Sequence, residues 1–138
     1  MKKEIAHQII QEIKTAQKLG REAGEKQYQI LFGQGEQYTV FVNDKPSGGM
    51  LDLCGFSMMT VPGNGKIVRA LKLLGEAEEN DHYKIGEDIL IYKNDRGYAL
   101  LLWLTSRQEI SVNDKATKAA TKYLNSKELE CTCRTVID

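Results

Sequence analysis

The feature that most constrains the fold is an unbroken apolar run from Ala99 to Leu104, inside the segment 97–105. Successive side chains of a β-strand point to opposite faces of the sheet, so a strand without polar positions needs cover on both faces. We therefore interpret this run as the central strand of a sheet. The rest of the chain is expected to supply the cover.

Length and composition indicate one α+β domain spanning residues 1–138. Its 19 basic and 19 acidic side chains balance, which argues against strong nonspecific binding to nucleic acid or lipid. Three cysteines make an odd count, which favours a reducing compartment over a disulfide framework. With no secretory signal and no apolar run long enough to cross a bilayer, we expect a cytoplasmic protein without membrane contact.

The N-terminal segment predicts an amphipathic helix from Lys2 to about Leu19. Its apolar stripe has helical spacing and consists of Ile5, Ile9, Ile13 and Ala16. Gly20 and Gly24 are interpreted as its stop signal. The stripe is expected to dock on the chain's own sheet or on another subunit.

A β-hairpin is predicted next, because aromatic and β-branched residues are concentrated at 28–32 and 38–42. The glycine-bearing segment 33–36 would form its loop. The following segment 43–49 contains Pro46 and two glycines, and is interpreted as a turn or an exposed loop.

From Met50 to Ile137 the patterns predict the order strand, helix, strand, strand, helix, strand. The predicted elements are strands at 50–61, 83–92, 97–105 and 128–137, a helix from Asn64 to Leu74, and a helix to Leu124 that begins with a capping box of Ser111 and Asp114. This order is that of a ferredoxin-like split β-α-β core. Both of its helices would cover one face of the sheet. The N-terminal helix and the hairpin, or a second subunit, would cover the other face.

No complete cofactor or metal site is recognisable, and we expect no cofactor. Cys131 and Cys133 lie two residues apart on a predicted strand, so both thiols point to one face and could begin a zinc site, but tetrahedral zinc needs four ligands. We interpret both as core thiols. Cys54 with His82 as base is the one candidate for a cysteine nucleophile.

A small-ligand site is conceivable at the turn between the strand that ends at Val61 and the following helix. Free backbone amides at such a turn can hold an anion. The candidate residues are Gly63, Asn64, Gly65 and Lys66. The glycine spacing is not that of a nucleotide-binding P-loop, and a plain turn with a helix cap is the alternative.

The segment 96–103 combines a basic residue, a glycine, an aromatic residue, an alanine and an apolar run. It resembles the core signature of the RNA-recognition motif family, at the strand where that family carries it. The resemblance implies that Arg96 meets a phosphate and that Tyr98 stacks on a base of single-stranded nucleic acid. Leu100 stands where the family has a second outward aromatic, and the alternative is a plain core strand.

The function that we expect is binding rather than catalysis, through self-association or contact with another protein on the sheet face that the two later helices leave open. Single-stranded nucleic-acid binding through Arg96 and Tyr98 is the second hypothesis. A ligand-binding protein or enzyme with a pocket near Cys54 and the Gly63 loop is the third.

Overall fold

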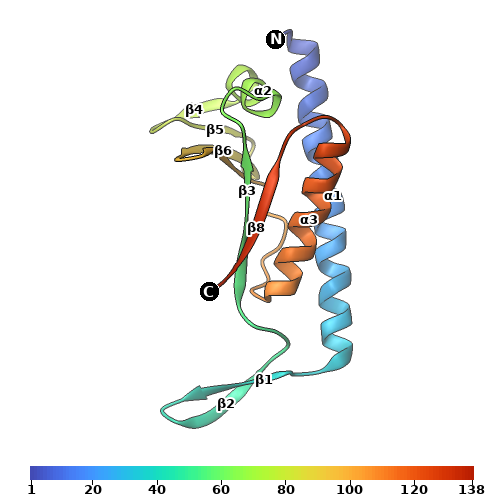
Figure 1. The fold of residues 1–138 in the computed structure, drawn as a ribbon, viewed down its shortest axis with the longest axis vertical. Coiled ribbons are helices and arrows are strands. Elements are labelled where there is room, and N and C mark those ends of the chain that lie inside the picture. The colour runs from blue at the N-terminus through green and yellow to red at the C-terminus, as the bar shows by residue number, and fades with distance from the viewer.

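A computed structural model describes residues 1–138 as a mixed α+β structure with three helices and two antiparallel sheets (Figure 1). The helices are α1 (Lys3–Gln34), α2 (Lys66–Leu74) and α3 (Ile110–Ser126). The strands are β1 (Tyr38–Val42), β2 (Lys45–Met50), β3 (Gly55–Val61), β4 (Glu76–Glu78), β5 (His82–Ile85), β6 (Ile89–Asn94), β7 (Gly97–Leu101) and β8 (Thr132–Ile137). The element order expected from Met50 onward is therefore present, with the segment 83–92 divided into β5 and β6 and with the short β4 added before them.

The larger sheet has six strands in the order β4-β5-β6-β7-β3-β8, and every neighbouring pair is antiparallel. The apolar run forms β7 between β6 and β3, as predicted for an interior strand, but β7 ends at Leu101. Trp103 then adopts a left-handed backbone conformation with φ 50°, and its side chain is 58% exposed. The prediction that the run stays sheltered up to Leu104 is wrong at this tryptophan.

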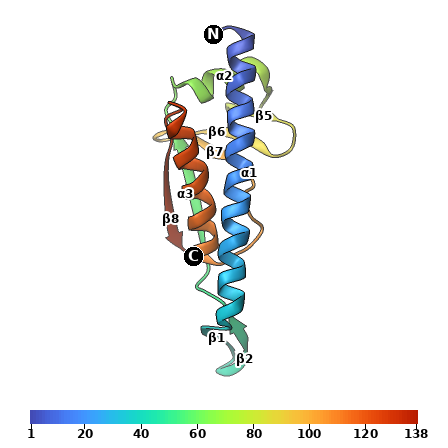
Figure 2. The ribbon, with the colours of Figure 1, turned by 90° about the vertical axis from the view of Figure 1, so that its right-hand side faces the viewer.

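One face of the six-stranded sheet carries the core. Ile91, Leu100, Met59 and Cys133 lie side by side across β6, β7, β3 and β8. The first three are almost fully buried, in one cluster with apolar residues of α1, α2 and α3. All three helices therefore cover the same face (Figure 2).

The position of α1 corrects two predictions. The helix does not cover the second face of the sheet, and it does not end at Gly20 or Gly24 but continues to Gln34. Both glycines are buried against α3, where a Cβ at Gly20 would lie 2.9 Å from the carbonyl oxygen of Ala116. They act as the contact surface that lets two helices approach closely.

The N-terminal hairpin is shifted along the chain relative to the prediction. Residues 28–32, predicted as a strand, form the last turns of α1. Residues 45–49, predicted as a turn or loop, form β2 together with Met50, which was predicted to begin the next strand. The turn is Asn43-Asp44, both with positive φ (51° and 61°), which suits a tight two-residue hairpin connection. β1 and β2 form a sheet of their own, separate from the six-stranded one.

Both later helices begin differently from their predicted caps. The residue before α2 is Gly65, not Asn64, and no side chain caps it. At α3 the cap comes from a distant residue, because the backbone N–H of Ser111 donates to Asp52 Oδ2 at 2.8 Å. Asp114 instead accepts from Thr135 of β8 at 2.9 Å and pairs with Lys118.

None of the three helices is both long enough and apolar enough to span a membrane.

Candidate interaction surface

The six-stranded sheet leaves its second face without a covering helix; we call it the open face. In Figure 1 β3 and β8 are seen nearly edge-on, with α1 and α3 to their right and the open face to their left. The alternation of side chains along β3 assigns Phe56, Met58 and Thr60 to this face, opposite to Met59 and Val61 in the core. Strand pairing extends the assignment to the neighbouring strands.

The half of the open face nearest the start of β3 is apolar. Phe56 is 46% exposed there, beside its antiparallel partner Val136 on β8. We define the apolar patch as Phe56, Met58, Leu90, Leu101 and Val136. The last four are half-buried by their neighbours. Trp103 follows β7 at the same end of the sheet, so large apolar surface is concentrated there.

The hairpin of β1 and β2 forms a second exposed apolar surface, which we call the arm. It leaves the lower end of α1 and extends past β3 and β8 toward the side of the open face (Figure 1). Phe41 and Val42 are 62% and 54% exposed, and Tyr38 is also exposed. These apolar side chains are therefore exposed to solvent in the single chain. A two-stranded hairpin on its own is also only marginally stable in water.

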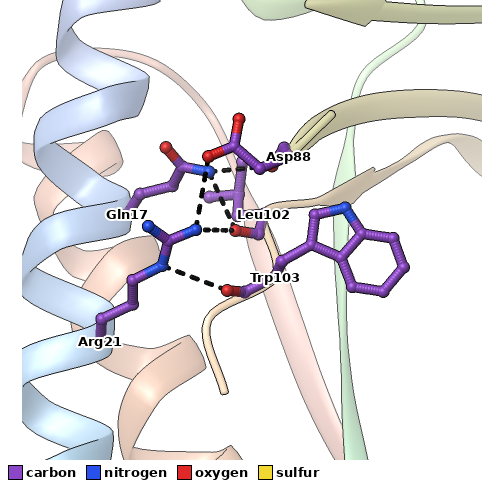
Figure 3. Close-up of polar contacts among 5 residues, drawn as sticks. All are labelled: Gln17, Arg21, Asp88, Leu102 and Trp103. Carbon is purple, nitrogen blue, oxygen red and sulfur yellow. Dashed lines mark hydrogen bonds and ion pairs between the residues drawn. The ribbon is translucent and has the colours of Figure 1, made fainter. Parts of the chain in front are cut away.

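A polar cluster fixes α1 against the end of β7, close to the apolar patch (Figure 3). The Gln17 side chain is buried, and its Nε2 donates to the carbonyl oxygens of Asp88 and Leu102 at 2.8 and 2.9 Å. Arg21 donates to the carbonyl oxygen of Trp103 at 3.2 Å. These bonds hold the chain where it leaves the sheet, while the Trp103 indole points away from α1.

The residues predicted to contact nucleic acid lie on different surfaces. Tyr98 is on the core face, opposite Val61, and only 5% exposed, with Lys72 Nζ 5.1 Å from its ring centre. The expectation that its ring is a platform on the open face is therefore wrong. Arg96 lies in the turn between β6 and β7 and lines a groove on the polar half of the open face.

The predicted anion-binding residues Gly63, Asn64, Gly65 and Lys66 form the turn that connects β3 to α2, as expected. The backbone N–H of Gly65 is already used, because it donates to the carbonyl oxygen of Pro62 at 3.0 Å. Nothing in the geometry adds a side-chain ligand at this turn, and anion binding there stays a prediction.

The candidate cysteine nucleophile and its base are far apart. Cys54 precedes β3, beside a groove of about 380 Å³ between the end of α1 and the base of the arm. His82 lies on β5, three strands away across the sheet and level with the other end of β3, which is more than about 20 Å. Cys54 and the Gly63 turn are likewise separated by the whole of β3. The structure does not bring these residues into one pocket.

The other two cysteines are structural in position. Cys131 is buried just before β8, and burial raises the pKa of its thiol to about 12. It is therefore a protonated thiol at neutral pH and a poor nucleophile. Cys133 is half-buried on the core face. No group of three or more histidine, cysteine or acidic side chains is arranged to hold a metal ion.

Two parts of this surface were not predicted as sites: the arm and the polar groove. The sequence signal for the arm is the turn-forming pair Asn43-Asp44. It lies between the β-branched and aromatic residues of β1 and Lys45, the first residue of β2. The groove has no local signal, because its residues come from three separate segments of the chain. Comparison with protein-family models, curated proteins and solved structures finds no match to this chain, so its function is argued from its own geometry.

Proposed function

We propose that this chain is a non-catalytic binding module that associates with a second copy of itself through the arm and the apolar patch. The observation that carries the proposal is that the arm extends toward the side of the open face (Figure 1), and that both surfaces carry exposed apolar side chains. We further propose that the core from Met50 to Ile137 is a ferredoxin-like split β-α-β unit. The strand order β8-β3-β7-β6, with α2 and α3 as the long connections, supports that topology.

A second copy is favoured over an unrelated protein by the way the two surfaces are placed. Two copies related by a two-fold axis use the same surface twice, so each arm can cover the patch of the other. One such contact would bury Phe41 together with Phe56. It would also give the two-stranded arm the further packing that a hairpin needs. The formal net charge of zero adds no repulsion between copies.

The test is the molar mass of the purified chain, measured by size-exclusion chromatography with light scattering over a wide concentration range. We expect about twice the 15.6 kDa of one chain. Phe41→Ser and Phe56→Ser should each shift the protein toward the monomer, because each places a hydroxyl where an apolar side chain was buried.

Leu73→Ser is the matched control, since Leu73 is 42% exposed on α2, on the helix side of the sheet. It should leave the dimer intact. Far-UV circular dichroism checks that all variants fold. A wild-type chain that stays monomeric at every concentration, or Phe41 and Phe56 variants that dimerise as well as the control, would exclude this interface.

A further inference from the structure

The polar half of the open face is hollowed into a groove that borders the apolar patch and shares only Met58 with it. Its volume is about 430 Å³. The lining residues are Met58, Thr60, Asn94, Asp95, Arg96, Thr132, Cys133 and Arg134. They come from β3, β8 and the turn between β6 and β7, so three parts of the fold converge on one surface.

Two guanidinium groups reach this groove from opposite sides. Arg96 belongs to the β6–β7 turn, and Arg134 belongs to the edge strand β8. Neither takes part in any of the four ion pairs of the structure. The only side-chain contact of the Arg134 guanidinium is with the sulfur of Met58 at 3.8 Å. With Asp95 as the single acid, the lining carries a net charge of +1 (two arginines less one aspartate).

Neutral hydrogen-bond donors surround the two arginines. Thr60 and Thr132 are directly paired across β3 and β8, and neither hydroxyl has a side-chain hydrogen bond within the chain. The Asn94 side chain accepts from the backbone N–H of Arg96 at 2.9 Å through its oxygen, which leaves its amide nitrogen as a free donor. The groove thus offers two forked cations and three neutral donors, against one carboxylate.

We propose that this groove binds a phosphate group. A phosphate presents several oxygens in a tetrahedral arrangement, and guanidinium forks bind such oxygens in bidentate pairs. A carboxylate has two oxygens in one plane and would leave one arginine without a partner. The phosphate can belong to a small phosphate ester or to the backbone of a single-stranded nucleic acid. The chemistry of recognition is the same for both.

The experiment is a titration of the ¹⁵N-labelled full chain with inorganic phosphate, followed by NMR, with sodium chloride at matched ionic strength as the reference. Saturable shifts are expected for Thr60, Thr132 and Arg134 with phosphate only. Arg96→Ala and Arg134→Ala should each weaken binding about tenfold or more, because each removes charge-assisted hydrogen bonds.

Arg69→Ala is the matched control, since it removes the same charge from the exposed side of α2. It should leave phosphate affinity unchanged. A second titration with an oligothymidylate of about eight nucleotides, lacking a terminal phosphate, separates the two sources. Tighter, salt-dependent binding of the oligonucleotide assigns the groove to nucleic acid. Binding of phosphate without the oligonucleotide assigns it to a phosphate ester.

The proposal is overturned if phosphate causes no saturable shifts beyond those of sodium chloride. It is equally overturned if Arg134→Ala binds phosphate as tightly as Arg69→Ala. Molar masses measured on the same samples keep this result separate from dimerisation. The arginine variants should still dimerise, and Phe41→Ser should still bind phosphate.

Discussion

Gln17 is a buried polar side chain in the apolar stripe of α1, and it joins two parts of the chain that come much later in the sequence. Its amide nitrogen donates to two backbone carbonyl groups, those of Asp88 and Leu102, and the Leu102 carbonyl also accepts a longer bond of 3.4 Å from Arg21. A buried carbonyl that loses its donor carries an uncompensated desolvation cost. Neighbouring Arg21 contacts the same region but is about half exposed, so water can replace its bonds.

We therefore expect Gln17→Leu to lower the free energy of unfolding by about 2 kcal/mol, although it adds apolar surface. Arg21→Ala should cost less than about 1 kcal/mol. Urea denaturation of both variants and the wild type measures the difference. A loss at Arg21 equal to or larger than that at Gln17 would contradict this account of Figure 3.

Side-chain direction at the residue scale also explains why Tyr98 could not be placed from the sequence. A strand with polar residues on one side shows which positions face the core. The run that begins at Ala99 is apolar at every position, so either alternation fits it. Only the pairing of Tyr98 with Val61 decides that the ring faces the helices.

At the scale of elements, the glycines of α1 show that the same residue type can either end a helix or let a second helix pack closely against it. Gly20 and Gly24 have the local signature of a helix end, yet they lie inside a helix at its closest approach to α3. Helix propensity depends on the local sequence. The requirement for glycine at this position comes instead from the close approach of Ala116 in α3, nearly a hundred residues later. Their high β-propensity similarly predicts a strand for the aromatic residues at 28–32, but these residues form helix because α1 continues through them.

Gly20→Ala is expected to lower the free energy of unfolding by about 1–2 kcal/mol. The new methyl group would overlap the carbonyl oxygen of Ala116, and this cost exceeds the gain in helix propensity. Gly33→Ala is the matched control in the same helix, because a Cβ there meets nothing within 4 Å. It should raise stability by up to about 1 kcal/mol. Thermal unfolding of the two variants should shift in opposite directions, and a parallel shift would refute the close approach.

The start of α3 depends on a residue outside the helix. Asp52 is partly buried, which by itself raises its pKa, but hydrogen bonds from Ser111 and Leu53 outweigh burial and hold the pKa of this carboxyl below its usual value. A lowered pKa means that the folded state favours the charged form. Its contribution to stability is therefore present at neutral pH and is lost as the pH falls below about 4.

Asp52→Ala should accordingly cost about 1–2 kcal/mol at pH 7, and the difference from the wild type should shrink in acid. Urea denaturation at pH 7 and near pH 3 measures both values. Glu130→Ala, at an exposed acid without an ion pair, should have little effect at either pH. A cost at Asp52 that does not change with pH would show that its charge is not involved.

At the scale of the whole molecule, the sequence predicted the order of elements after Met50 and a common face for α2 and α3, but not the face of the sheet on which α1 packs. Hydrophobic periodicity identifies a helix and its apolar stripe, and α1 has such a stripe, although Ile5 is exposed. Periodicity does not say which face of a sheet receives the helix. Because α1 joins α2 and α3 on one face, no helix covers the open face.

The separation along the chain between α1 and its partners also has a consequence for biosynthesis. One buried hydrogen-bond partner of α1, Leu102, is 85 residues later in the sequence. At ordinary rates of translation, α1 is synthesised on the order of 4 to 17 s before this partner. During this interval the apolar stripe of α1 has no sheet to cover it.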